Sequence, residues 1–325
     1  MTATRPAVLV ARQIFPEVIA RLAEHFEIES NEEAIDWPQP ELIRRLQCKA
    51  GVFIAAQEPI DAALLDACPA LRAVCSMAVG YNNIDVPACT ARGVQVTNAP
   101  DVLTETTADF GFALMMATAR RIAESEHFLR AGQWQRWSYD LFAGADVQGS
   151  TLGILGMGRI GQAIARRGAL GFGMKVIYQN RSRLAPELEA PICARWVEKT
   201  ELLRQADHLV LVVPYSPASH HAIGAAELAL MKPTATLTNI ARGGVVDDAA
   251  LAHALAERRI AAAGLDVFEG EPAVHPGLLD VPNVVLTPHI ASATLATRRK
   301  MAMLAADNLI ALLGGGKALT PVNVL

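Results

Sequence analysis

The sequence predicts an α/β protein built from two doubly wound parallel sheets. Three observations lead to this fold class. Short apolar runs alternate with longer segments of helical period along most of the chain. The 325 residues are long for one domain, since roughly 150 residues per domain is usual. A glycine-rich motif also follows one of the apolar runs and opens a helical segment.

The first series of alternating segments occupies the amino-terminal part of the chain. The runs Ala7–Val10, Gly51–Ile54 and Ala73–Cys75 have the length and the β-branched content of buried strands, and a helix is expected near Pro16–His25. This alternation favours a parallel sheet with helices on both faces. The series is interrupted at residues 94–100.

Residues 103–131 then read as one long helix. Its apolar face carries Phe110, Leu114, Ala117 and Ile122. Helices of this length often bridge domains or contact a second subunit. The segment is therefore one reason to expect a homodimer.

A second series predicts six strands of a larger sheet, and a last helix follows it. That helix covers residues 294–313 and ends at the run Gly314–Gly316, with no further strand behind it. We therefore expect it to return to the first domain, so that residues 1–100 with 295–325 form one domain and residues 101–294 the other. The six expected strands are 151–155, 175–178, 208–213, 234–239, 261–265 and 284–287.

The composition excludes several classes of protein. Hydrophobic residues make up 52% of the chain and charged residues 19%, which rules out general disorder. The 29 basic and 33 acidic residues are interspersed, giving a formal charge of -4, so neither nucleic acid nor a membrane surface is an expected partner. Apolar stretches such as residues 209–213 are far shorter than the ~18 residues of a membrane span, and no signal sequence is recognised, so a cytoplasmic location is expected.

Neither disulfides nor a metal site is predicted from residue spacing. The five cysteines are odd in number and lack a CxxC pair, and the eight histidines form no HExxH or HxH pattern. Reduced cysteines in apolar positions are the expected reading.

The glycine motif reads Gly156-Met157-Gly158-Arg159-Ile160-Gly161, between the apolar run Leu152–Leu155 and a helical segment. In such a motif the first glycine permits the tight turn, the second lets the backbone approach a pyrophosphate, and the third lets the helix pack on the strand. The free N–H groups of the helix terminus then bind the diphosphate. The sequence thus predicts a dinucleotide site.

The end of the next strand indicates which dinucleotide is preferred. A site specific for NAD(H) usually has a carboxylate there that hydrogen-bonds the ribose hydroxyls, but the sequence has Asn180-Arg181-Ser182-Arg183. An amide does not repel a 2′-phosphate, and Arg181 or Arg183 can clamp one with charge-assisted hydrogen bonds. NADP(H) is therefore the predicted cofactor, with NAD(H) retained as an alternative. The competing interpretation is that both arginines are solvated surface charges.

Five further segments carry a family resemblance over nearly the whole chain. Together with the glycine motif, the sequence resembles the D-isomer-specific 2-hydroxyacid dehydrogenases, in particular the glyoxylate/hydroxypyruvate and 2-ketogluconate reductase branch. The resemblance implies a flavodoxin-like substrate domain, a Rossmann nucleotide-binding domain, and often a homodimer. The segments are 80–85 (GYNNID), 98–105 (NAPDVLTE), 239–244 (NIARGG), 265–272 (LDVFEGEP) and 286–290 (LTPHI).

The catalytic residues implied by the resemblance are Arg242, Glu271 and His289. Reduction of a 2-keto acid places a hydride on the carbonyl carbon and a proton on the oxygen, and an imidazole that titrates near neutrality can donate that proton. Glu271 would orient the ring of His289, with Glu269 as the second choice. Arg242 offers a planar fork that can bind the substrate carboxylate and polarise the ketone.

The resemblance also implies substrate and cofactor contacts. The backbone of Ala78-Val79-Gly80 is expected to hold the other end of the substrate carboxylate. Trp134 and Trp137 are either core anchors or residues of the substrate mouth. The remaining expected cofactor contacts are Val102 and Thr106 near the nicotinamide, Asp266 on its carboxamide, Pro214 beside the adenosine, and Val213, Ile240, Ala241 and His289.

Three functions are compatible with this fold. Some relatives are corepressors that use nucleotide binding to control assembly, but the joint presence of Arg242, Glu271 and His289 favours an enzyme. Formate dehydrogenase is a further relative, for which a glutamine is expected where Glu271 stands. A small 2-keto or 2-hydroxy acid is thus the predicted substrate, and its side chain is left open.

Overall fold

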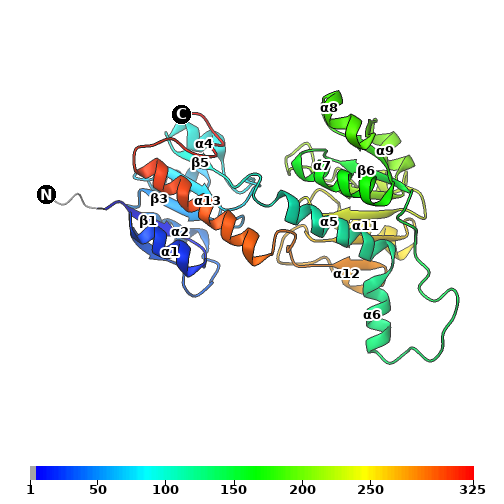
Figure 1. Cartoon of the computed structure of the whole chain (residues 1–325). Helices are drawn as coiled ribbons and strands as arrows, with labels where there is room; N and C mark the ends of the chain where they lie inside the picture. Colours follow the sequence, from blue (N-terminus) through cyan, green and yellow to red (C-terminus); the bar gives the residue numbers. More distant parts are fainter. Residues whose placement is uncertain (1–4) are drawn as a thin grey trace. The chain divides into compact units, whose positions relative to one another are not determined.

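The computed structural model describes residues 5–325, which divide into two compact units (Figure 1). One unit holds the chain up to Leu103 together with Ala293–Leu325, and the other holds Thr104–Ser292. Each unit is an α/β structure around a parallel sheet, which confirms the predicted fold class. Within residues 5–325, no helix is both long enough and apolar enough to span a membrane.

The first unit contains a five-stranded sheet in the order β2-β1-β3-β4-β5, with every pair parallel. This is the flavodoxin-like order. The sequence predicted three of these strands and missed β2 and β5, which form the two edges. β2 is polar and β5 is short, so neither has the apolar pattern of a central strand. The strands are β1 (Ala7–Val10), β2 (Glu27–Ser30), β3 (Gly51–Ile54), β4 (Ala73–Ser76) and β5 (Gln95–Thr97).

The last helix of the chain packs on this first sheet. α13 (Leu295–Leu313) contacts β3, β4 and α1, and a Cβ added to Gly51 would lie 2.7 Å from the side chain of Leu309. The fully buried Asn308 ties the helix to the C-terminal segment, since its Oδ1 accepts hydrogen bonds from the N–H groups of Leu319 and Thr320. The other helices of the unit are α1 (Pro16–Ala23), α2 (Gln39–Leu46), α3 (Ala62–Ala67) and α4 (Val86–Ala91).

The second unit contains a seven-stranded parallel sheet in the order β12-β11-β10-β9-β6-β7-β8. The strand order reverses between β6 and β9, as in the Rossmann fold. The six strands predicted from the sequence are present, and the seventh, β8, is an edge strand of two residues, too short to show a pattern. The strands are β6 (Thr151–Leu155), β7 (Lys175–Gln179), β8 (Arg195–Trp196), β9 (His208–Leu211), β10 (Thr236–Asn239), β11 (Ala262–Leu265) and β12 (Val284–Leu286).

The helices of the second unit cover both apolar faces of its sheet, where two clusters of buried side chains lie. A π-helical turn, Arg167–Gly171, directly continues α7. The helices are α5 (Thr104–Ala119), α6 (Ile122–Arg130), α7 (Arg159–Arg166), α8 (Pro186–Glu189), α9 (Lys199–Gln205), α10 (Ala225–Leu228), α11 (Asp248–Ala256) and α12 (Pro276–Asp280).

The prediction of one long helix over residues 103–131 is wrong, because the chain turns at Arg121. This residue adopts a left-handed φ of 52°, its guanidinium pairs with Glu124, and the N–H of Ala145 donates to the carbonyl of Ala119. No Gly or Pro marks the break in the sequence. Leu114 on α5 is buried, and α5 packs on β10, β11 and α7. Of the expected apolar face, Leu114 therefore packs on the sheet of its own unit, whereas Ile122 on α6 is 53% exposed.

Candidate active site

The glycine motif forms the turn between β6 and α7. Gly156 has a φ of 102°, and a Cβ there would lie 2.7 Å from the backbone of Val212. A Cβ on Gly161 would lie 2.3 Å from the carbonyl oxygen of Gly156, so the helix packs closely on the turn. At Gly158 a Cβ would have no heavy atom within 4 Å among the described residues. The first and third glycines are thus required by the turn, whereas the second leaves backbone open to a ligand.

A cavity of about 640 Å³ opens beside this turn, at the carboxyl ends of β6, β7 and β9. Its volume lies within the range usual for cofactor sites, about 300–1,000 Å³. The exposed backbone at Gly158 and the first N–H groups of α7 suit a pyrophosphate, so the residues present fit a dinucleotide. The lining residues from the predicted cofactor site are Gly156, Gly158, Asn180, Arg181, Ser182, Val213 and Pro214. Met157 is buried in the core, and Arg159 and Ile160 are the first residues of α7.

Asn180 is bonded to the glycine turn. Its Oδ1 accepts a hydrogen bond of 2.6 Å from the N–H of Met157, and its carbonyl accepts one of 3.1 Å from the indole of Trp196. Among the described residues that line the cavity, none is Asp or Glu. The lining therefore lacks the carboxylate that would repel a 2′-phosphate.

The two arginines beside Asn180 have different surroundings. Arg183 is held by Glu189, with its Nη2 2.6 Å and its Nε 2.9 Å from the two carboxylate oxygens. The pKa of Glu189 is lowered by these bonds and by the hydroxyl of Tyr178. Arg181 lines the cavity, and within residues 5–325 it has no hydrogen bond or ion pair. The structure thus leaves Arg181, and not Arg183, available to a ligand.

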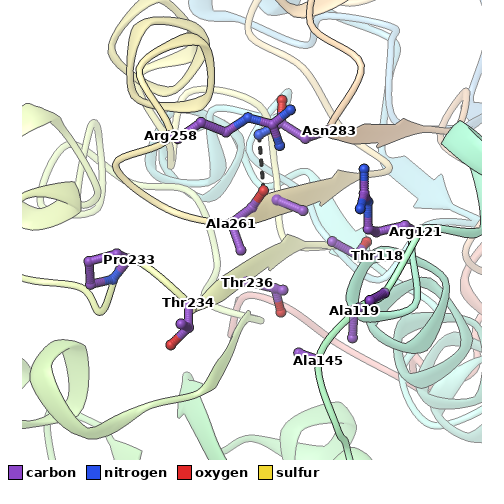
Figure 2. A pocket seen from close by; sticks show the side chains of 13 residues that line it. Thr118, Ala119, Arg121, Ala145, Pro233, Thr234, Thr236, Arg258, Ala261 and Asn283 are labelled. Carbon is purple, nitrogen blue, oxygen red and sulfur yellow. Dashed lines mark hydrogen bonds between the residues drawn. The ribbon is translucent and has the colours of Figure 1, made fainter. Parts of the chain in front are cut away.

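A second cavity, of about 540 Å³, lies at the amino ends of the strands of the same sheet (Figure 2). Its lining includes Thr234 and Thr236 at the start of β10 and Ala261 at the start of β11, where Asn283 donates a 3.0 Å hydrogen bond to the Ala261 carbonyl. Ligands of open α/β sheets bind beyond the carboxyl ends of the strands. This rule makes the carboxyl ends of the strands, where the first cavity lies, the candidate active site.

Arg242, Glu271 and His289 follow β10, β11 and β12, three neighbouring parallel strands. His289 Nδ1 lies 2.7 Å from Glu271 Oε2, and Glu271 Oε1 accepts a 2.9 Å hydrogen bond from the N–H of Phe268. Glu269 lies instead 2.9 Å from Nε2 of His221. Of the two carboxylates considered from the sequence, Glu271 is the one that contacts the ring of His289.

Glu271 and Arg242 each stabilise the charged form of the other. Burial by itself raises the pKa of Glu271, but the hydrogen bond with His289, the Phe268 N–H and the positive charge of Arg242 together lower it. Burial lowers the pKa of Arg242, and Glu271 opposes that effect. Arg242 Nη1 also donates a 2.7 Å hydrogen bond to the Ala241 carbonyl. The arrangement favours an ionised carboxylate beside the imidazole and a charged guanidinium nearby.

Asp266 holds the backbone around His289. His289 adopts a left-handed φ of 53°, and its N–H donates to the Asp266 carbonyl at 2.9 Å. The buried carboxylate of Asp266 accepts 2.8 Å hydrogen bonds from Thr287 Oγ1 and from the N–H groups of Ile290 and Ala291. Burial raises the pKa of Asp266. Both of its carboxylate oxygens are thus already bonded within the chain, and its expected contact with the nicotinamide carboxamide stays a prediction.

Asn239 positions the turn that carries Arg242, and the sequence analysis did not single it out. Its Oδ1 accepts from the N–H of Ala241 at 3.0 Å and its Nδ2 donates to the Arg242 carbonyl at 3.3 Å. Next in the turn, a Cβ on Gly243 would lie 1.7 Å from the Phe268 carbonyl oxygen. An asparagine that ends a strand is an ordinary loop signal, so the sequence alone did not distinguish this residue.

The predicted substrate turn lies in the first unit, directly after β4. The N–H of Ala78 donates to Ser76 Oγ at 3.1 Å, and the Val79 carbonyl accepts from Asn98 Nδ2 at 2.8 Å. Within residues 5–325, the N–H groups of Val79 and Gly80 have no hydrogen-bond partner. Two of the three expected donors are therefore available to an anion.

The other expected residues are placed as follows. Val102 belongs to the first unit and Thr106 to α5 of the second, while Ile240 and Ala241 are buried in the turn after β10. Trp134 and Trp137 are 56% and 76% exposed, so neither is a core anchor.

Known proteins resemble this chain over nearly its whole length. The D-isomer specific 2-hydroxyacid dehydrogenase NAD binding domain matches residues 112–291. The chain is 48% identical to the glyoxylate reductase of Thermococcus onnurineus over 98% of this chain and 96% of the relative. It resembles the crystal structure of a glyoxylate reductase from Paecilomyes thermophila, with a TM-score of 0.89, 33% identity, and 99% of both chains covered.

A second solved structure is that of an NADPH-dependent glyoxylate/hydroxypyruvate reductase from Sinorhizobium meliloti in complex with NADP and malonate. The TM-score is 0.86 at 37% identity, covering 98% of this chain and 97% of that one. The similarity covers both units of the chain. The chain belongs to the D-isomer-specific 2-hydroxyacid dehydrogenase family, in its glyoxylate reductase branch.

Proposed function

We propose that this protein reduces small 2-keto acids to D-2-hydroxy acids, with glyoxylate and hydroxypyruvate as substrates, 2-ketogluconate as a further one, and NADPH preferred over NADH. The proposal rests on the 2.7 Å contact between His289 Nδ1 and Glu271 Oε2. These residues follow the carboxyl ends of strands in the same sheet whose β6 leads into the glycine motif. The names of the relatives from T. onnurineus and S. meliloti support the substrate class.

The reaction needs one hydride and one proton. The reduced nicotinamide, when bound, supplies the hydride to the carbonyl carbon. His289 supplies the proton to the carbonyl oxygen from Nε2, because its Nδ1 is engaged by Glu271. The carboxylate stabilises the imidazolium before transfer, and the neutral ring remains afterwards. In the reverse direction the neutral ring accepts the hydroxyl proton.

Arg242 and the turn after β4 each offer hydrogen-bond donors that suit a carboxylate. The guanidinium places positive charge where the ketone oxygen becomes negative and can hold the substrate carboxylate through a second N–H. In the first unit, the N–H groups of Val79 and Gly80 are donors that suit a carboxylate. A guanidinium that contacts both the carboxylate and the ketone requires a substrate in which these groups are adjacent, as in a 2-keto acid.

Steady-state oxidation of NADPH and NADH with glyoxylate, hydroxypyruvate and 2-ketogluconate tests the proposal. We expect His289→Ala to lower kcat about 10²–10⁴-fold, the usual contribution of a general acid, with much less change in NADPH binding. Arg242→Lys should also lose activity, because an ammonium lacks the planar fork. His253→Ala is the matched control, since His253 is an exposed residue of α11 that lies 3.5 Å from Glu257 and is not among the three proposed catalytic residues. Near wild-type turnover in His289→Ala would refute the assigned proton donor.

We further propose that the protein is a homodimer. The support is the family membership and the exposed apolar side chains of the segment after α5. Of these, Leu129 is 57% exposed and Tyr139 is 86% exposed. Sedimentation should give twice the mass of one chain, and a monomer at micromolar concentration would contradict this. The expected cytoplasmic location stays a prediction, which cell fractionation would test.

A further inference from the structure

Within residues 5–325, three metal-ligating side chains form a cluster outside the pair of His289 and Glu271. His220 and His221 lie in the segment between β9 and α10, and Glu269 lies in the loop after β11. One ligand atom from each residue lies within 4.8 Å of the other two. We call these three residues the His–His–Glu cluster.

The backbone brings the cluster together. His221 adopts a left-handed φ of 47°, and its N–H donates a 2.7 Å hydrogen bond to the Gly244 carbonyl. The rings of His220 and His221 stack with centroids 3.9 Å apart, and His221 Nε2 lies 2.9 Å from Glu269 Oε2. The N–H of Glu269 is held by the Asp248 carboxylate at 3.0 Å. These contacts fix the backbone positions of His221 and Glu269 and hold the ring of His220 beside that of His221.

The second nitrogen of each histidine ring has a polar neighbour. His220 Nδ1 lies 3.2 Å from the hydroxyl of Tyr215, and His221 Nδ1 lies 3.9 Å from Asp247 Oδ2. A histidine that binds a metal through one nitrogen usually directs its other N–H to such an oxygen, which fixes the tautomer. The Tyr215 hydroxyl thus leaves Nε2 of His220 for coordination. The 3.9 Å to Asp247 is too long for a hydrogen bond, and the atom of His221 that faces the cluster is Nε2, beside Glu269.

We propose that the His–His–Glu cluster binds one divalent transition-metal ion of the Zn²⁺ type, through Nε2 of His220, Nε2 of His221 and a carboxylate oxygen of Glu269. Two imidazoles and one carboxylate suit Zn²⁺, Co²⁺ or Ni²⁺, whereas Mg²⁺ and Ca²⁺ prefer oxygen ligands. The ion takes the place of the proton between His221 and Glu269. The exposed ring of His220 turns out of its stack on His221, because the lone pairs of two parallel rings do not meet at one ion. Water completes the coordination, because His220 and Glu269 are exposed.

The bound ion joins the segment after β9 to the loop after β11. Glu269 precedes Glu271 by two residues in that loop, so the ion restrains the segment that carries the orienting carboxylate. Binding itself needs neither substrate nor nicotinamide. The inference is therefore tested separately from the proposed reductase activity.

The test is calorimetric titration of the chelator-treated full chain with ZnCl₂, without substrate or cofactor. We expect saturable binding of one ion per chain, weakened more than about 100-fold by His220→Ala or Glu269→Gln, because each removes a direct ligand. Tyr215→Phe removes only a neighbour of a ligand and should weaken binding about 10–100-fold. Co²⁺ should give a visible absorption spectrum that Zn²⁺ abolishes.

His253→Ala again serves as the matched control, because it removes an exposed histidine that lies 3.5 Å from a carboxylate oxygen of Glu257 but has no second imidazole beside it. Its Zn²⁺ affinity should equal that of the unaltered chain, and MgCl₂ should give no saturable heat. Circular dichroism confirms that each variant is folded. Absence of saturable Zn²⁺ binding, or equal affinity in folded His220→Ala, would overturn the proposal.

Discussion

Arg181→Ala should lower kcat/KM for NADPH and leave kcat/KM for NADH nearly unchanged. Arg181 lines the 640 Å³ cavity and has no ion-pair partner among residues 5–325, so its charge is available to a 2′-phosphate. A hydrogen bond to a charged group contributes about 1.5–3 kcal/mol. At 1.36 kcal/mol per factor of ten, the expected loss with NADPH is about 10–150-fold.

Arg183→Ala is the informative comparison, since it removes the neighbouring arginine with a different structural consequence. Arg183 is bonded to Glu189, which also accepts a 2.6 Å hydrogen bond from the hydroxyl of Tyr178. That hydroxyl accepts in turn from the N–H of Leu184 at 2.8 Å. Loss of Arg183 should therefore disturb the segment after β7 and affect both cofactors similarly.

The assay is steady-state kinetics with glyoxylate at saturation and each cofactor varied, for the unaltered chain and both variants. The quantity compared is the ratio of kcat/KM for NADPH to that for NADH. We expect this ratio to fall only in Arg181→Ala. An equal loss with both cofactors, or a larger fall in Arg183→Ala, would refute the assignment of the 2′-phosphate to Arg181.

Three further changes have expected outcomes. Gly243→Ala places a Cβ 1.7 Å from the Phe268 carbonyl oxygen and should reduce the free energy of unfolding by about 1–3 kcal/mol or more in denaturant titrations; unchanged stability would contradict this. Asn239→Ala removes both hydrogen bonds of the Arg242 turn and should lower kcat more than NADPH affinity, measured by fluorescence titration. Asp207→Asn should cost about 1 kcal/mol at neutral pH, because Asp207 accepts from the Thr151 N–H and pairs with Lys232 at the partly exposed start of β6. Burial raises the pKa of Asp207, but the bonds with Lys232 and Thr151 outweigh burial and hold that pKa below its usual 3.8. The difference in the free energy of unfolding between the unaltered chain and Asp207→Asn is therefore full above pH 3.8, and it should vanish as the pH falls through the lowered pKa.

The central parts of both sheets could be predicted because their residues carry a local pattern. Leu152–Leu155 is apolar and is followed at once by the glycine turn, so strand, turn and helix are all visible in one short stretch. The edge strands β2 and β8 were missed since they bury little and show no apolar run. The break at Arg121 was missed because it depends on contacts with Phe142 and Ala145, which lie later in the chain.

One contact of the candidate site was predicted from the sequence and another was not. The expected contact between Glu271 and His289 is present, whereas nothing in the sequence indicated that Glu269 contacts His221. Likewise, the sequence does not show which of Arg181 and Arg183 is available to a phosphate. The distinction comes from Glu189, which binds Arg183 in the fold. The His–His–Glu cluster escaped spacing rules because His221 and Glu269 are 48 residues apart.

The left-handed backbone at His289 bears on which substitutions the chain accepts there. With a φ of 53°, the position favours Gly and Asn, accepts His, and disfavours Val and Ile, whose branched side chains rarely enter this region. At position 289, folding therefore depends on whether the residue tolerates a left-handed backbone, whereas turnover depends on whether its side chain can donate a proton. A library of all residues at position 289, scored once for folded abundance and once for turnover, should separate these two requirements, with Asn and Gly abundant but inactive and Val and Ile depleted in both scores.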